Sequence, residues 1–361
     1  MTRPAADGPG GPGSGGRVGV LVNPVAGAGR GRRVGAALRE RLGAAGHDVV
    51  DVSGDDAVAA SARLGAAGLL DALVVVGGDG MVHLGLQAVA GTGTPLGVVP
   101  VGTGNDFAAC LGLVRRSTGA EVADVCAALA AGSVRRVDAV EVRADGRSRW
   151  VAGAVSAGLD AAVNARANAM RRPRGAARYT LAALAEIAAF RAWAYRLQFD
   201  GVVDDGGLPL TAAGDGPAAS TARWAGRAAV VTAANTDRIG GGIRVAPAAV
   251  VDDGLLDVLV APVLTRRGAA TIFPSMFTGR HVRRRDVHVV RAAAVRITAG
   301  PHDPASGGHP LAHGDGEPLA PLPVQVRAVP GALGVLVPPH THGPSGAPGV
   351  HLGPPGSGTV G

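Results

Sequence analysis

Lysine is absent from this chain of 361 residues, so arginine supplies all 35 basic side chains, against 28 acidic ones. A Walker-A phosphate loop, the strand lysine of protein kinases and a Schiff-base mechanism each need a lysine amine, and all three are excluded. With only Cys110 and Cys126, neither a disulfide framework nor a four-cysteine zinc site is possible. Aromatic residues make up 3% of the chain and no nucleic-acid-reading motif is present, so we expect no nucleic-acid partner.

Long apolar runs are also missing. No stretch reaches the roughly 18 residues that span a bilayer, and the N-terminus lacks the apolar core of a signal peptide. The sequence therefore indicates a cytoplasmic protein. Its net charge of +7 favours an anionic partner such as a nucleotide or an anionic membrane surface, although codon bias explains an arginine-rich composition equally well.

Glycine and proline are abundant, with 58 and 25 residues, and they gather at the two ends. We expect disordered tails at 1–16 and 338–361. Between them, residues 17–133 alternate between apolar strands and helices, which predicts an α/β domain with a mainly parallel sheet. The strands are expected at 17–24, 48–53, within 69–80 and within 94–106, and the helices at 34–45, 57–68 and 81–90.

From about Arg136 the pattern changes to many short apolar runs separated by Gly, Asp and Pro. This pattern predicts a mainly antiparallel β-sandwich or barrel, here assigned to 134–337 with a boundary near Ser133. One helix, expected at Tyr179–Trp193, interrupts the strands.

Three turns rich in glycine follow strands of the predicted parallel sheet. Gly77-Gly78-Asp79-Gly80 follows one strand, PVGTGNDFA (100–108) follows the next, and Asn23-Pro24 with Gly27 and Gly29 follows the first. Glycine lets backbone N–H groups approach phosphates, and a carboxylate such as Asp79 can hold Mg²⁺ or orient a hydroxyl. A single GGDG also fits an ordinary strand-to-helix turn. Three such turns at one sheet edge predict a nucleotide site.

These motifs resemble the diacylglycerol kinase catalytic family, which includes bacterial lipid kinases and sphingosine kinases. The resemblance extends to AANTDRIGGGIRVAPAAVVDDGLLDVLV (233–260) and HGDGEPL (313–319), and residues 157–181 are similar to its actinobacterial branch. It covers about 17–337. It implies an N-terminal domain like that of NAD kinase and phosphofructokinase, a C-terminal β-sandwich, and an active site between them. The last segment, 320–337, is expected to return to the first domain.

The reaction implied is transfer of the γ-phosphoryl group of ATP to a lipid hydroxyl with Mg²⁺, most simply diacylglycerol to phosphatidic acid in phospholipid biosynthesis. Asp315 and Glu317 are the candidate bases, and Asp79 joins them as a catalytic and magnesium-binding residue. Asp253 and Leu255 match a second, structural metal position, although a plain Asp-Gly turn fits as well. The residues implied to bind ATP are Asn23, Gly27, Gly29, Ser53, Gly77, Gly78, Asp79, Gly80, Thr103, Gly104 and Asn105.

Two positions depart from the family pattern. The family has Thr and Glu where this chain has Met81 and Leu84. His83 is a candidate substitute, but a histidine on the helix surface is the expectation. An NAD kinase-like enzyme and a non-catalytic nucleotide- or lipid-binding protein therefore stay open as alternatives. The turn at 100–108 and the Asp-Gly-Glu at 315–317 favour the lipid kinase.

Two basic clusters predict peripheral attachment to the inner face of an anionic membrane. A solvated arginine face is the equally plausible alternative. Homodimers are common in the family. As phosphoryl acceptors in place of diacylglycerol, a sphingoid base, an undecaprenol-type alcohol and a glycolipid stay open. The clusters are Arg171, Arg172, Arg174 and Arg178, and Arg280, His281, Arg283, Arg284 and Arg285.

Overall fold

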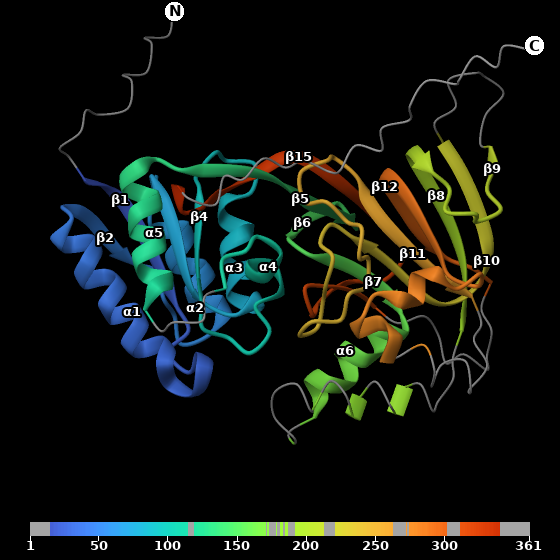
Figure 1. Ribbon diagram of the computed structural model, residues 1–361, viewed down its shortest axis with the longest axis horizontal. Coiled ribbons are helices and arrows are strands. Elements are labelled where there is room, and N and C mark those ends of the chain that lie inside the picture. Colours follow the sequence, from blue (N-terminus) through green and yellow to red (C-terminus); the bar gives the residue numbers. More distant parts are fainter. Residues whose placement is uncertain are drawn as a thin grey trace, which may run out of the picture.

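A computed structural model describes residues 15–114, 119–170, 172, 178, 181–182, 185–186, 192–212, 221–262, 272, 274–301 and 311–339. The described chain forms two parts that share one mixed sheet of 15 strands (Figure 1). The N-terminal part lies at one end of the elongated molecule, and the C-terminal part lies at the other (Figure 1).

The N-terminal part is built on a parallel sheet in the order β4-β3-β1-β2. Its strands are β1 (Gly15–Val22), β2 (His47–Asp51), β3 (Ala72–Gly77) and β4 (Leu96–Pro100). Its helices are α1 (Ala26–Ala44), α2 (Ala57–Ala66), α3 (Asp79–Val89), α4 (Asp106–Cys110) and α5 (Ala120–Ala131).

The central strand β3 shows why this sheet has helices on both faces. All its residues are buried, and alternate side chains enter different cores. Leu73 and Val75 pack in the core beneath α3, whereas Val74 and Val76 pack in the core beneath α1 and α5. A strand buried on both faces has a continuous apolar sequence, as the run ALVVV does.

The C-terminal part consists of antiparallel strands. Along β8 the residues Tyr195, Leu197 and Phe199 are buried between the sheets, while Arg196 between them is exposed, as the period of two in a strand requires. The elements are β5 (Val134–Ala144), β6 (Arg147–Val151), β7 (Ala154–Gly158), α6 (Leu159–Ala169), β8 (Trp193–Asp204), β9 (Thr211–Ala212), β10 (Thr221–Ala234), β11 (Leu256–Pro262), the 3₁₀ helix η1 (Arg280–Arg283), β12 (His288–Ala299), β13 (Ala312–Gly314), β14 (Glu317–Ala320) and β15 (Val324–Leu336).

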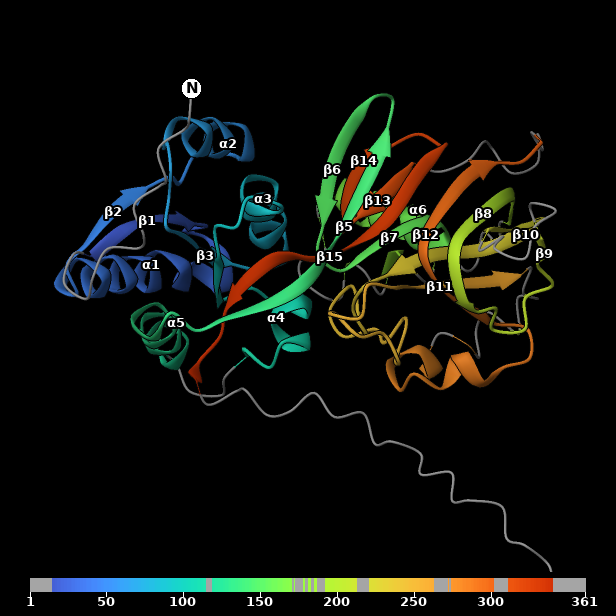
Figure 2. The same ribbon diagram turned by 90° about the horizontal axis from the view of Figure 1, so that it is seen from above.

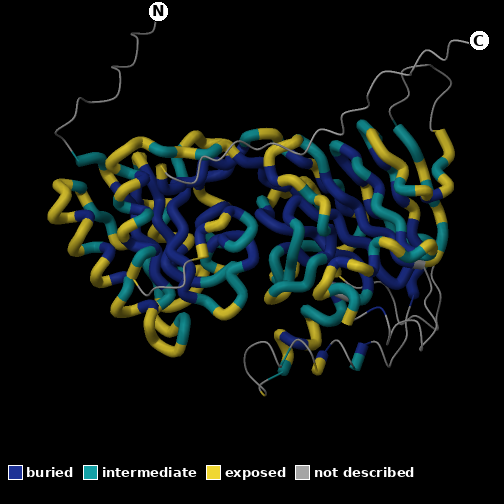
Figure 3. Tube along the Cα trace, viewed as in Figure 1, coloured by how far each residue is buried: buried dark blue, intermediate teal, exposed yellow. Residues whose placement is uncertain are grey.

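Strand β15 joins the two parts. It pairs with β12 and β5 in the C-terminal part, and its end pairs with β4 of the N-terminal part, where Val335 lies beside Leu96. Seen from above, β15 and β5 run together from one part to the other (Figure 2). The sandwich has its own buried interior, whereas the core beneath α3 also takes in Val137, Ala139, Ala152 and Val251 of the C-terminal part (Figure 3).

The fold confirms the predicted α/β part followed by a mainly antiparallel sandwich. Some expected elements are wrong in detail. The helix expected from Val34 belongs to α1, which runs from Ala26 but is kinked, because Gly27, Ala28 and Gly29 have left-handed, non-helical backbone angles and regular helix follows only after them. Gly15 and Gly16, expected in a tail, belong to β1.

The helix expected at Tyr179–Trp193 is only partly described. Leu181, Ala182, Ala185 and Glu186 are helical, and the residues between them lie outside the described part of the chain. Trp193 begins β8 instead, with its side chain buried in the sandwich. In the part of the chain that the structure describes, no helix is both long and apolar enough to span a membrane.

Candidate active site between the two parts

Two glycine turns form the floor of the site because they follow neighbouring parallel strands. Gly78 links β3 to α3, and the turn from Gly102 to Asn105 links β4 to α4. The turns lie backbone against backbone, since a Cβ on Gly102 would lie 2.5 Å from the Cα of Gly78. The N–H groups of Met81 and Val82 donate to the Gly78 carbonyl, so those of Asp79 and Gly80 are the ones at the start of α3 that suit a phosphate chain.

The third turn lies at the end of β1. The Asn23 side chain accepts a hydrogen bond from the Val25 N–H at 3.1 Å and orders the start of the turn. Gly27 has a φ of 57°, and a Cβ there would lie 2.4 Å from the Val101 carbonyl oxygen. Gly29 has a φ of 90° and no atom within 4 Å of a Cβ position, so its outer side is open to a ligand.

Several residues expected to touch ATP use their side chains to hold these turns. Asn105 accepts from the Gly102 N–H at 3.0 Å and donates to the Gly102 carbonyl at 2.8 Å. The Ser53 hydroxyl accepts from the Val22 N–H at 2.9 Å. Thr103, in contrast, is exposed and makes no hydrogen bond with the described residues.

Two carboxyl groups face each other beside the glycine turns. Asp79, the first residue of α3, accepts from the Phe107 N–H of α4 at 3.3 Å. Burial raises the pKa of Asp79, and the charges of Asp106 and Asp315 raise it further. Asp106 reaches the other part of the molecule, where it accepts from the Gly241 N–H at 2.7 Å, and burial raises its pKa too.

The C-terminal part contributes Asp315 from the turn between β13 and β14. Asp315 has a φ of 51°, and its side chain is 8% exposed. Its Oδ1 accepts from the Gly153 N–H at 2.8 Å, and its Oδ2 accepts from the Ala152 N–H at 2.8 Å. The Nδ1 of His83, on α3, lies 3.3 Å from the same Oδ2.

His83 therefore does not lie on the helix surface as expected. Its side chain is only 11% exposed, because α3 turns this face towards the C-terminal part. The helical spacing of four residues from Asp79 was a signal for this placement, since residues at i and i+4 share one face. Asp106 was missed as well, because Asp106 after Asn105 fits an ordinary helix cap.

Glu317, the first residue of β14, lies near α3. It is exposed, and one of its carboxylate oxygens lies 4.0 Å from the position of a Cβ on Gly80. Thus Asp79, Asp106, Asp315 and Glu317 gather where α3 faces the β13–β14 turn. Asp315 is held by neighbouring donors, whereas Glu317 is exposed.

Met81 and Leu84 both serve packing. They rest against the core beneath α3, and a Cβ on Gly77 would lie 2.3 Å from the Cγ of Met81. Met81 therefore lies directly against the backbone of the glycine turn. The threonine hydroxyl and glutamate carboxylate of the family pattern are replaced here by apolar contacts.

The carboxylates of Asp79 and Asp106 fit a magnesium ion. Asp79 and Asp106 are oxygen donors with raised pKa values, and a divalent cation would relieve their mutual repulsion. Among the described residues, no three His, Cys, Asp or Glu side chains lie close enough to hold a metal by themselves. Phosphate oxygens and water would have to complete the coordination.

The expected structural metal does not fit its residues. Asp253 accepts from the Leu255 N–H at 3.0 Å and from the guanidinium of Arg291. Arg291 also approaches Asp257 at 3.7 Å. Since arginine already supplies positive charge to Asp253, a cation there would compete with Arg291 for the same carboxylate.

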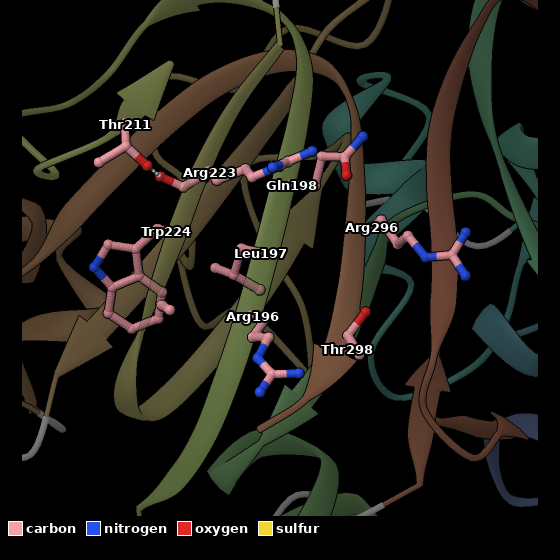
Figure 4. Close-up of a pocket in the computed structure, with 9 residues that line it drawn as sticks. Arg196, Leu197, Gln198, Thr211, Arg223, Trp224, Arg296 and Thr298 are labelled. Carbon is pink, nitrogen blue, oxygen red and sulfur yellow. Dashed lines mark hydrogen bonds between the residues drawn. The ribbon is translucent and has the colours of Figure 1, made fainter. Parts of the chain in front are cut away.

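A cavity of about 490 Å³ lies elsewhere, on the sandwich. Side chains of β8, β10 and β12 surround it, including Arg196, Arg223 and Trp224 (Figure 4). Arg296 also lines it but points away from Arg223 (Figure 4). None of the candidate catalytic residues lines this cavity.

The second basic cluster is only partly a cationic surface. Arg280, Arg283 and Arg285 are exposed. His281 is 1% exposed and its Nε2 lies 3.1 Å from the Val245 carbonyl oxygen, while Arg284 pairs with Asp286. Of the first cluster, only Arg172 and Arg178 are among the described residues.

Comparison with known proteins agrees with the two-part fold. Residues 17–142 match the diacylglycerol kinase catalytic domain, and residues 153–337 match the YegS C-terminal NAD kinase beta sandwich-like domain. A diacylglycerol kinase of Mycobacterium tuberculosis is 36% identical over 331 residues, which cover 90% of this chain and 96% of that protein. A protein of Stenotrophomonas maltophilia, named a probable YegS-like lipid kinase, is 26% identical over 287 residues, covering 77% and 81%.

The crystal structure of a diacylglycerol kinase from Bacillus anthracis has the same fold, with a TM-score of 0.60 at 18% identity, covering 90% of this chain and 98% of that one. The fold and the matched domains thus define a lipid kinase with an α/β part and a β-sandwich part. The chain belongs to the diacylglycerol kinase catalytic-domain family of lipid kinases.

Proposed function

We propose that this lipid kinase transfers the γ-phosphoryl group of ATP to the free hydroxyl of diacylglycerol, at an anionic cytoplasmic membrane surface, in phospholipid biosynthesis. The Mycobacterium tuberculosis relative supports the choice of diacylglycerol. The observation that carries the proposal is the position of Asp315, a nearly buried carboxylate of the C-terminal part that lies 3.3 Å from His83 of α3, the helix that begins at the glycine turn.

The glycine turns bind the phosphates of ATP. Backbone N–H groups at the start of α3, after Gly78, would donate to the triphosphate, and the helix dipole adds favourable charge there. Thr103 offers a hydroxyl, and Gly29 leaves open backbone. Asn23, Gly27, Ser53, Gly104 and Asn105 shape the loops around the nucleotide.

Asp79 and Asp106 would hold Mg²⁺ beside the phosphates. Bound Mg²⁺ would neutralise charge on the transferred phosphoryl group.

Asp315 acts as the general base. It removes the proton of the lipid hydroxyl while that oxygen forms a bond to the γ-phosphorus and the bond to the bridging oxygen of ADP breaks. Glu317, exposed beside Gly80, would orient the lipid hydroxyl or the water around a bound Mg²⁺.

The test is phosphate transfer from labelled ATP to lipids in mixed micelles with Mg²⁺, comparing wild type with Asp315→Asn. General-base catalysis contributes about 10²- to 10⁴-fold, so the variant should lose activity on that scale. Asp145→Asn is the matched control, because Asp145 also has a positive φ, of 47°, in a turn of its own. Full activity of Asp315→Asn would contradict the proposed base, and transfer only to another lipid would contradict diacylglycerol.

Membrane attachment is assigned to the exposed side of η1. Arg280, Arg283 and Arg285 are exposed there, near Phe277, which is 46% exposed. Each arginine near an anionic leaflet contributes about 1 kcal/mol. Replacing all three by glutamine should weaken co-sedimentation with phosphatidylserine vesicles. Homodimer formation stays a prediction.

A matched control removes equal charge from the sandwich, by replacing Arg196, Arg223 and Arg296 with glutamine (Figure 4). If this control loses vesicle binding and the η1 variant does not, the attachment surface lies on the sandwich.

A further inference from the structure

Helix α3 connects the nucleotide turn with the proposed base. Asp79 begins the helix, and His83 lies one turn later on the same face. The Nδ1 of His83 lies 3.3 Å from Oδ2 of Asp315, 232 positions further along the chain. This contact crosses from the N-terminal to the C-terminal part at the place where phosphoryl transfer is proposed.

The chemistry of the pair determines which group donates. An ionised carboxylate only accepts hydrogen bonds, whereas a neutral histidine carries its proton on one of two nitrogens. A nitrogen lone pair facing the carboxylate at this distance would repel it. His83 must therefore present Nδ1–H to Asp315, as the Ala152 and Gly153 N–H groups do.

This arrangement singles out one oxygen of the base. A carboxylate has about four lone-pair positions. Among the described residues, Ala152 and His83 occupy Oδ2, and Gly153 occupies one position on Oδ1. The free position lies on Oδ1, which can take the proton of the substrate hydroxyl.

From this geometry we infer that His83 is a positioning residue, whose Nδ1–H holds Asp315 so that Oδ1 faces the lipid hydroxyl. The inference rests on the proposed role of Asp315. His83 itself exchanges no proton with the substrate. It links the orientation of the base to α3, so that nucleotide turn and base keep one relative position.

A purely structural role for His83 would be to dock α3 onto the C-terminal part. Gln87, one turn further along α3, provides a matched comparison. Its side chain donates to the Trp150 carbonyl of β6 at 2.7 Å and accepts from the Trp150 N–H at 3.0 Å. Gln87 thus docks the same helix without touching Asp315.

The experiment compares His83→Ala, His83→Asn and Gln87→Ala in the lipid phosphorylation assay. One hydrogen bond to a charged group corresponds to about 10- to 100-fold in rate, so His83→Ala should lower kcat by that factor and leave the KM values for ATP and lipid nearly unchanged. His83→Asn should recover most of kcat, because its amide N–H can replace Nδ1–H. Gln87→Ala should keep kcat.

Two outcomes would overturn the inference: equal kcat losses in His83→Ala and Gln87→Ala, or a wild-type kcat in His83→Ala. If Asp315→Asn is inactive while His83→Ala is fully active, only the role of His83 fails. If Asp315→Asn is fully active, the proposed base itself fails.

A spectroscopic measurement tests the hydrogen bond between His83 and Asp315 independently of the kinase assay. Long-range ¹H–¹⁵N spectra of the whole protein, with His83 assigned by comparison with His83→Asn, report which ring nitrogen carries the proton. We expect the Nδ1–H tautomer at pH 7.5. An Nε2–H tautomer would refute the inference whatever the kinase assay shows.

Discussion

Replacing Gly102 by alanine tests the contact between the two glycine turns. The new Cβ would lie 2.5 Å from the Gly78 Cα, 0.9 Å short of the 3.4 Å at which ordinary contact begins. The turns must therefore separate by about 1 Å, because the Gly78 Cα is backbone and cannot rotate away, and the Asn105 Oδ1, 2.9 Å from the same Cβ, must shift as well. Overpacking of this kind costs about 1–3 kcal/mol of folding free energy.

The larger effect falls on the kinase reaction. A displacement of about 1 Å in a positioning element costs on the order of 10²-fold in rate. We expect Gly102→Ala to lower ATP affinity in calorimetry and kcat in the lipid assay, both more strongly than the loss of stability alone explains. Gly102 has no positive φ, so alanine is not strained by the backbone conformation there, and any loss comes from the contact with Gly78 and Asn105.

Gly43→Ala is the control. A Cβ at Gly43 in α1 meets nothing within 4 Å, and alanine in a helix is favoured by up to about 1 kcal/mol. This variant should be at least as stable as wild type and fully active. If Gly102→Ala binds ATP as tightly as Gly43→Ala does, the close approach of the turns is not what shapes the nucleotide site.

Three further predictions concern other regions. Burial raises the pKa of Asp257 to about 6, so the stability that its protonated form contributes is present at low pH and lost as pH rises through that value. Between pH 4.5 and 7.5 this loss amounts to about 2 kcal/mol, which Asp257→Asn should remove in urea titrations. An unchanged stability difference between the two pH values would refute this. Asp106→Asn keeps an acceptor for the Gly241 N–H but removes charge beside Asp79, so activity should need more Mg²⁺; an unchanged Mg²⁺ titration would contradict that role. Phe199→Ala should cost about 3–5 kcal/mol in the sandwich core, whereas Arg196→Ala on the opposite face should change stability by less than about 0.5 kcal/mol.

Local pattern was enough to predict the architecture of the N-terminal part. The run ALVVV predicts a doubly buried strand, and the glycine turns after it predict a ligand edge, because parallel strands place their carboxyl ends together. Local pattern failed where short-range signals compete. Trp193 at the end of an apolar stretch suggested helix, yet cross-strand burial places it in β8.

The doubly buried strand, the glycine turns and the carboxylates next to them could be predicted from the sequence, since these features depend on neighbours within a few positions. The contacts of His83 with Asp315, of Asp106 with Gly241 and of Arg291 with Asp253 depend on the three-dimensional fold. These pairs are 232, 135 and 38 positions apart, and no periodicity encodes them. The order of strands in the shared sheet and the docking of α3 on the C-terminal part bring these distant residues together, because both arrangements are fixed by burial of the apolar cores.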